Sequence, residues 1–146
     1  MAVEGLTPLP CACASLRRAA RAVTSAYAFE LRGTGLNPTQ FTLLQALDRS
    51  GPGTQGALGD LLALDSATLT RTLAPLARRG WIRAVRGEDR RQIRWELTPT
   101  GLRRLVAASH SWKRAQTRLR EQLGERRWVR LTSDLAAVAA AAQLGD

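Results

Sequence analysis

The sequence is short of the residues on which most enzyme and metal sites depend. Its 146 residues include one histidine, His110, one lysine, Lys113, and two cysteines, Cys11 and Cys13. It contains no G-x-S-x-G motif, no phosphate-binding glycine loop and no paired-carboxylate site. A metal site made from His110 and the two cysteines would match no familiar ligand spacing. These absences argue against an enzyme, a resident cofactor and a metal site.

Long apolar runs are also missing. No stretch approaches the roughly 20 apolar residues that a membrane span needs, and the first residues lack the basic and apolar regions of a signal peptide. Cys11 and Cys13 are too close in sequence for an ordinary intrachain disulfide, which fits a reducing compartment. We therefore expect a cytoplasmic protein with no membrane partner. A chain of this length suits one domain that buries roughly 68–70% of its unfolded surface.

What the chain has in excess is arginine. It carries 22 basic and 12 acidic side chains, for a net charge of +10. Ten arginines and three acidic residues lie between Arg71 and Arg104, so a net +7 falls in under a quarter of the chain. Focused positive charge favours a polyanionic partner such as nucleic acid. A solvated basic face is the alternative interpretation of the same charge.

The most informative stretch begins with a capped helix. Asp65 is a good N-cap, and Leu69, Leu73 and Leu76 then recur at helical spacing on one buried stripe. The opposite face carries small side chains and arginines, flanked by hydroxyls: Ala67, Arg71, Ala74 and Arg78, with Thr68 and Thr70. Gly80 stands where such a helix ends in a left-handed cap.

A two-stranded ribbon follows this helix. Two alternating runs, residues 81–86 and 92–97, are joined by the basic tip G-E-D-R-R. In the second run Ile93, Trp95 and Leu97 share one face, which is the period of a half-buried strand. A charged tip has no packing role, so Arg90 and Arg91 are candidates for DNA contacts. The pattern suits a helix in a major groove and a wing over a minor groove.

Helical spacing and caps predict the other elements. A long amphipathic helix should cover residues 11 to about 32, a second should begin at Asn37-Pro38, and a short one should follow Thr54. Thr98-Pro99 should start a long helix, and an Ala-rich helix should cover about 126–143. The short helix, its tight turn and the helix after Asp65 make a helix-turn-helix.

These elements predict a mainly α fold with a small β-wing. We expect a single domain over residues 1–146, with a winged helix-turn-helix DNA-binding unit at 36–98. The helices at 11–33 and 99–144 have surplus apolar surface that needs a partner, and a two-fold homodimer is the commonest answer. They are therefore expected to be dimerisation helices.

Residues 65–105, DSATLTRTLAPLARRGWIRAVRGEDRRQIRWELTPTGLRRL, resemble the core of the MarR family of bacterial transcriptional regulators. The resemblance covers Cys11 to the C-terminus, and its most specific part is the wing with the following L-T-P-T-G. It implies a homodimer on a pseudo-palindromic double-stranded DNA operator. It also implies a repressor that is released by a small aromatic, phenolic ligand or by an oxidant such as an organic hydroperoxide.

The resemblance also implies roles for individual residues. Four of them match recognition-helix positions that approach bases or phosphates: Ser66, Thr68, Thr70 and Arg71. Arg91 matches the wing arginine of the minor groove, and Asp89 matches the acid that orients the wing. Cys13 matches the peroxide-reactive cysteine of the hydroperoxide-sensing members, and Tyr27 matches a tyrosine that supports it.

The role of the thiols stays open. Cys11 and Cys13 lie at the start of a helix, where the helix dipole favours a negatively charged sulfur, yet buried thiols often act as plain hydrophobes. Cys13 and Tyr27 lie about 21 Å apart along one helix, so they could meet only across a dimer with antiparallel first helices. Cys11 is an additional thiol, and C-x-C differs from the redox C-x-x-C motif.

We therefore predict a sequence-specific DNA-binding regulator, a homodimeric repressor. A non-specific architectural DNA-binding protein would need only the charge, and a redox enzyme would use the two cysteines. Operator footprinting separates the first two classes, and peroxide turnover with a thiol reductant tests the third.

Overall fold

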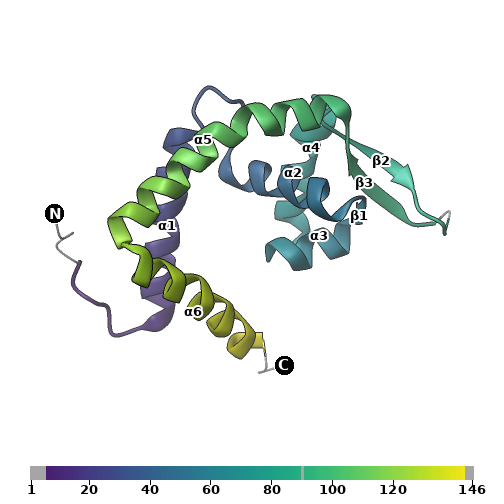
Figure 1. The fold of residues 1–146 in the computed structure, drawn as a ribbon. Coiled ribbons are helices and arrows are strands. Elements are labelled where there is room, and N and C mark those ends of the chain that lie inside the picture. The colour runs from purple at the N-terminus through teal and green to yellow at the C-terminus, as the bar shows by residue number, and fades with distance from the viewer. Residues whose placement is uncertain (1–5, 90, 144–146) are drawn as a thin grey trace.

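Helices make up most of the structure. The computed structural model describes residues 6–89 and 91–143. The elements of this part of the chain are, in order, α1 (Ala12–Glu30), α2 (Pro38–Ser50), β1 (Gly53–Thr54), α3 (Gln55–Leu62), α4 (Ser66–Arg78), β2 (Ile82–Arg86), β3 (Ile93–Leu97), α5 (Pro99–Leu123) and α6 (Glu125–Gln143). Figure 1 shows α2, α3, α4 and the sheet together on one side, and α1 and α6 on the other. The long helix α5 joins the two sides (Figure 1), and the mainly α fold with a small β-wing is confirmed.

Local caps explain where four of the helices begin. The Asn37 side chain accepts a hydrogen bond from the backbone N–H of Gln40 at 2.8 Å, and the Gln40 side chain accepts one from Asn37 at 3.1 Å. This reciprocal pair is a capping box. Thr54, Asp65 and Thr98 each accept a backbone N–H at the start of α3, α4 and α5. The helix starts predicted at these four positions are confirmed.

The turn between α3 and α4 is tight. Ala63 ends α3 in the left-handed conformation, with φ of 50°, and the N–H of Leu64 donates to the carbonyl of Gly59 at 2.9 Å. A Cβ on Gly59 would lie 3.1 Å from the Leu64 carbonyl oxygen, whereas Gly56 faces open space. Gly59 thus lets the turn fold back closely on α3. Of the two glycines that lower the helix propensity of α3, Gly56 and Gly59, this contact explains Gly59.

The sheet has one strand more than the sequence pattern indicates. Its order is β1-β3-β2, and both pairings are antiparallel. In the register, Trp95 lies opposite Gly53 on one side and Ala84 on the other. The two residues of β1 are too few to show an alternating pattern, so only the pairing with β3 defines them as a strand.

The wing extends past the core, which corrects one expectation. Trp95 and Leu97 are half-buried, as the alternation predicts, but Ile93 is 60% exposed although it shares their face. Ile93 pairs with Arg86 at the outer end of the hairpin, beyond the helices that cover the other two side chains. The alternating pattern therefore predicts correctly that Ile93 shares a face with Trp95 and Leu97, but predicts its burial incorrectly.

The hydrophobic core lies between α2, α4 and the base of the wing. Its largest fully buried side chains are Phe41, Leu31, Leu43, Leu44, Leu69, Leu76 and Ile82. Trp112 of α5 stacks on Phe41, with 5.6 Å between ring centroids. Trp112 is therefore packed against the core, where it is partly buried.

The start of α5 is bonded to the end of α4 and the base of the wing. The N–H of Thr98 donates to the Trp81 carbonyl at 3.0 Å, and the Thr98 hydroxyl donates to the Gly80 carbonyl at 2.6 Å. A Cβ on Gly101 would lie 1.9 Å from the Trp81 carbonyl oxygen, so only glycine permits this approach. The close packing of α5 against Trp81 therefore explains the glycine of the L-T-P-T-G stretch.

The side of the molecule formed by α1 and α6 is thinly packed. No residue of α1 is buried, and none of the described side chains of α6 is buried. Val129, Leu135 and Val138 of α6 are 56%, 45% and 45% exposed. Across the described residues, every helix is too short or too polar to span a membrane.

Candidate DNA-binding surface

The exposed face of α4 is made of small side chains and arginine. Leu69, Leu73 and Leu76 are 1%, 2% and 0% exposed, so the apolar stripe of the helix is fully used in the core. The opposite face is exposed at these positions: Ala67, Thr70, Arg71, Ala74 and Arg78. Such a face lets a helix backbone approach the base edges of a major groove closely, with long side chains at defined points.

Hydrogen bonds organise the first turn of α4. Thr68 donates its hydroxyl to Asp65 at 2.6 Å and its backbone N–H to the same carboxylate at 2.9 Å. These two bonds hold the pKa of the Asp65 carboxyl below its usual value, and the bond from the Thr68 hydroxyl has the larger effect. Arg71 in turn donates to the Thr68 hydroxyl oxygen at 3.2 Å. The chain of contacts fixes the guanidinium of Arg71 beside the start of the helix, next to the exposed Ser66.

Gln55 is a surface residue that the sequence analysis missed. It lies at the start of α3, and its side-chain amide donates to the Thr70 hydroxyl oxygen at 2.8 Å. The bond joins the two helices of the helix-turn-helix across 15 positions. A glutamine directly after a capping residue is not a signal for this contact, because the turn between the helices decides which side chains meet.

The tip of the wing is held by Asp89. Its carboxylate accepts the backbone N–H of Arg91 at 3.0 Å, and its carbonyl accepts the N–H of Gln92 at 2.9 Å. Asp89 and Arg91 are both exposed, while Arg90 lies outside the described residues. Arg83 and Glu96 pair across the two strands at 2.5 Å. The wing therefore presents Arg91 from a turn whose backbone is fixed by its own aspartate.

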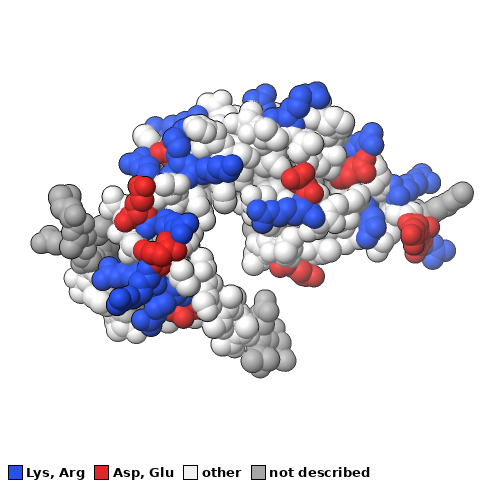
Figure 2. Space-filling view, viewed as in Figure 1, with Lys and Arg blue, Asp and Glu red and all other residues white. Residues whose placement is uncertain are grey.

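Basic side chains also cover surfaces outside α4 and the wing. Figure 2 shows them over the first turns of α5 and at the end of α5 near α6. At that end several are neutralised: Glu30 of α1 pairs with Arg114 at 3.0 Å and Arg118 at 2.7 Å, and Arg120 pairs with Glu125 at 2.6 Å. No ion pair is found for the arginines of α4 in the part of the chain that the structure describes.

Trp81 is enclosed by two arginines. The guanidinium carbons of Arg79 and Arg104 lie 4.8 and 5.0 Å from its ring. Arg79 also donates to the carbonyl of Gly35 at 2.7 Å, and Arg104 donates to the carbonyl of Thr34 at 3.3 Å. These two arginines therefore bind the loop before α2 to the end of α4 and the start of α5, which is a structural use of positive charge.

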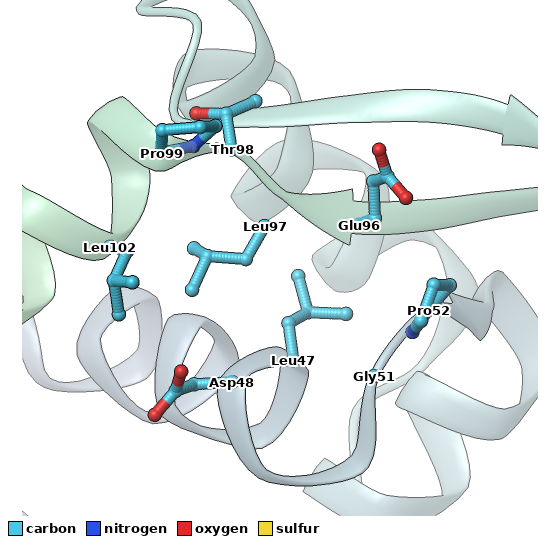
Figure 3. Close-up of a pocket in the computed structure, with 9 residues that line it drawn as sticks. All are labelled: Leu47, Asp48, Gly51, Pro52, Glu96, Leu97, Thr98, Pro99 and Leu102. Atoms are coloured by element: carbon cyan, nitrogen blue, oxygen red, sulfur yellow. The ribbon is translucent and has the colours of Figure 1, made fainter.

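Cavities lie at the base of the wing and between α1 and α5. One, of 360 Å³, sits at the base of the wing, where Figure 3 shows Leu47, Leu97 and Leu102 pointing toward one another. The second, of 480 Å³, is a groove between α1 and α5. Its lining combines apolar side chains with an ion pair and an amide: Ala26, Phe29, Glu30, Ala115, Arg118, Leu119 and Gln122.

The candidate redox residues lie on α1. Cys11 is the N-cap and Cys13 lies in the first turn, and both thiols are free and exposed. Tyr27 is half-buried near the other end of the helix, where its hydroxyl donates to Gln116 of α5. Burial raises the pKa of Tyr27. The structure thus does not bring Cys13 and Tyr27 together within one chain, as their spacing along the helix predicts. Among the described residues, none of the His, Cys, Asp and Glu side chains gather in a group that could hold a metal ion.

Comparison with known proteins identifies relatives of this fold. A model described as the MarR family matches residues 36–93. YwoH, an uncharacterized HTH-type transcriptional regulator of Bacillus subtilis (strain 168), is 31% identical over 77 residues. That match covers 53% of this chain and 56% of YwoH, so it spans about half the length of that relative.

Solved structures match nearly the whole chain. The transcriptional regulator MosR of M. tuberculosis is 34% identical with a TM-score of 0.82, over 92% of this chain and 97% of MosR. MosR in complex with DNA gives 35% identity and the same TM-score. The transcriptional repressor CouR, bound to a 23-mer DNA duplex, is 28% identical with a TM-score of 0.81, over 88% of this chain and 92% of CouR.

Proposed function

This chain belongs to the MarR family of transcriptional regulators, which bind DNA and are not enzymes, and from this premise we propose that it is a homodimeric repressor of a pseudo-palindromic operator. The exposed face of α4 enters the major groove, and the wing tip with Arg91 lies over the adjacent minor groove. The observation that carries the proposal is the small, arginine-bearing face of α4 beside a wing whose tip is held by Asp89.

The chemistry of the surface supports a division of roles. Arg71 stands among small side chains at the centre of the α4 face, which suits a base contact. Arg78, at the last turn of the helix, and Arg91, at the wing tip, suit phosphate and minor-groove contacts. The proposed DNA-binding unit is residues 36–98. MosR and CouR, which have been solved with DNA, supply the precedent for this partner.

Exposed apolar side chains support the homodimer. Phe29 of α1 and Val129 of α6 are each 56% exposed, and Val106 of α5 is 65% exposed. Together with Leu135 and Val138 they form apolar surface on the three helices at 11–33 and 99–144 that we assign to dimerisation. A two-fold dimer would cover this surface and present two α4 helices to the two half-sites of one operator.

Two routes to release from DNA have support. The exposed thiol of Cys13 can meet a hydroperoxide, and oxidation near the dimer helices would alter the spacing of the two DNA-binding units. The groove between α1 and α5 offers the second route. Its apolar walls, Phe29 and Leu119, and its amide, Gln122, suit a small aromatic ligand such as a phenol.

Selection and footprinting test the DNA-binding proposal. Duplexes bound by the protein are selected from a random pool, and the bound site is mapped by footprinting. We expect discrete protected palindromes, whereas uniform coverage would favour an architectural DNA-binding protein. Arg71→Ala should reduce the discrimination between operator and random duplex more than Arg103→Ala, because Arg103 lies at the start of α5, where a contact can reach only phosphate.

A DNA-binding titration with and without organic hydroperoxide tests the oxidation route. We expect the wild type to be released and to rebind after reductant, Cys13→Ser to stay bound, and Cys11→Ser to respond partially. Release of Cys13→Ser to the same extent as the wild type would exclude Cys13 as the sensor. The aromatic ligand in the α1–α5 groove would then be the proposed inducer.

A further inference from the structure

The threonine hydroxyls on α4 donate their protons within the protein. Thr68 donates to Asp65 at 2.6 Å, and Thr70 donates to the carbonyl of Ser66 at 2.9 Å. Thr72 donates to the carbonyl of Thr68, also at 2.9 Å. Because a hydroxyl has one proton, none of the three can also donate to a base without breaking a bond that stabilises the helix or its cap.

The hydroxyl oxygens of Thr68 and Thr70 accept hydrogen bonds as well. Gln55 donates to Thr70 at 2.8 Å, and Arg71 donates to Thr68 at 3.2 Å. The acceptors that purines and thymine present in the major groove, N7, O6 and O4, need a donor from the protein. The threonines of α4 have no proton left to offer them. Each of these two oxygens accepts a bond on one of its two lone pairs, and the group of each side chain that needs no hydrogen-bond partner is the methyl, an apolar surface.

The neighbours of Thr70 on this face are apolar too. Ala67 and Ala74 lie one turn before and one turn after it, and both are exposed. Over the seven steps from Ala67 to Ala74 the helix rises about 10 Å, which spans about three base pairs. Within that span Arg71 is the one long side chain, and its bond to Thr68 leaves most of its N–H donors for a guanine.

We propose that α4 reads its operator through thymine methyl groups packed against Thr70, Ala67 and Ala74, with Arg71 on a guanine within the same three base pairs. Thymine is the base that presents an apolar group, its C5 methyl, in the major groove. The half-site is therefore a guanine with thymines on neighbouring base steps, and Gln55 is a positioning residue that keeps the Thr70 hydroxyl turned to the protein. This inference rests on the proposed function, because it requires α4 to lie in the major groove.

Replacing thymine by uracil tests the inference directly. Uracil keeps the base pair and the O4 acceptor and lacks only the C5 methyl. The probe is the palindromic duplex recovered by selection from the random pool, with single thymines of each half-site replaced symmetrically. We expect a loss of about fourfold in affinity for each buried methyl, or about sixteenfold for a symmetric pair. Equal affinity for every uracil duplex would overturn the inference.

Two substitutions at Thr70 separate the methyl from the hydroxyl. Thr70→Val keeps a methyl and removes the hydroxyl, so its thymine-to-uracil affinity ratio should stay near that of the wild type. Thr70→Ser keeps the hydroxyl and removes the methyl, so the ratio at the contacted thymine should fall toward one. The opposite pattern would show that the hydroxyl reads the base and would overturn the inference.

A matched control lies on α2. Thr42 is exposed and donates its hydroxyl to the carbonyl of Pro38 at 3.0 Å, which is the arrangement of Thr70 with Ser66. Thr42→Ser should therefore leave the thymine-to-uracil ratio unchanged. The uracil titration of the wild-type protein needs no variant, so it decides the inference even if a Thr70 variant folds poorly.

The failure of the inference can be told apart from the failure of the proposed function. If selection recovers a palindrome and Arg71→Ala reduces discrimination, the proposed function holds, and insensitivity to uracil overturns the methyl readout alone. If selection recovers no discrete site, or Arg71→Ala leaves discrimination intact, the proposed function is overturned and the methyl readout falls with it.

Discussion

Gly101 offers the sharpest test of how α5 is joined to the DNA-binding unit. The new Cβ of Gly101→Ala would lie 1.9 Å from the Trp81 carbonyl oxygen and 2.8 Å from Leu97. An ordinary contact needs 3.4–4 Å, so the start of α5 must move by about 1.5 Å. The Thr98 N–H bond to the same carbonyl, 3.0 Å long, would then be lost.

The expected cost follows from these terms. Overpacking of this kind costs about 1–3 kcal/mol, and the lost hydrogen bond about 0.5–1.5 kcal/mol. The gain in helix propensity from glycine to alanine returns at most about 1 kcal/mol. The net loss in the free energy of unfolding is about 2–3 kcal/mol, which lowers the melting temperature by roughly 5–10 °C for a domain of this size.

Thermal unfolding at fixed protein concentration measures the effect, because a dimer melts in a concentration-dependent way. Gly56→Ala is the control, since a Cβ there meets nothing within 4 Å. It should raise the free energy of unfolding by about 0.5–1 kcal/mol through helix propensity. If Gly101→Ala melts within a degree of the wild type, the close approach of α5 to Trp81 is refuted.

Three further predictions concern the wing, the link between α1 and α5, and the dimer. Arg91→Ala should weaken operator binding by about 1–3 kcal/mol and leave melting nearly unchanged, and equal affinity at physiological salt would contradict the role of the wing. Hydrogen bonds from Arg118 and Arg114 lower the pKa of Glu30 below its ordinary 4.5, so the stability that they supply is present above pH 4.5 and is lost as the pH falls through the folded-state pKa. Glu30→Gln should therefore flatten the acid limb of the melting profile, and an unchanged limb would show that this carboxylate is not involved. Deleting residues 126–146 removes most of α6 and should give monomers or insoluble protein, whereas a soluble and fully dimeric truncation by sedimentation would place the interface elsewhere.

Short-range signals in the sequence determined most of the helices. A cap acts on N–H groups two or three residues away, so Asn37, Asp65 and Thr98 identify helix starts without knowledge of the fold. The spacing of Leu69, Leu73 and Leu76 likewise identifies the buried face of α4, and with it the exposed face that we propose for DNA binding. The family resemblance rested on the same local stretches and is confirmed.

Contacts between distant segments could not be predicted in this way. β1 exists through its pairing with β3, some forty positions later. Gly101 is required by the carbonyl of Trp81, a residue that directly precedes β2. The partner of Tyr27 is Gln116, 89 positions away. Patterns within a few residues do not specify which surfaces will meet, because the meeting depends on the packing of the whole chain.

The exposed face of α4 shows what the sequence determines and what the tertiary structure determines. The sequence by itself determined that Arg71 lies on the side of α4 opposite the leucines, flanked by Thr68 and Thr70, since helical periodicity requires it. Only the tertiary structure decided what those side chains have left to offer DNA. The turn at Ala63 brings Gln55 to Thr70, and the cap at Asp65 engages Thr68, so two hydroxyls are bonded within the protein while Arg71 still faces outward. Hydrogen-bonding capacity depends on neighbours in space, and periodicity along the chain carries no information about those neighbours.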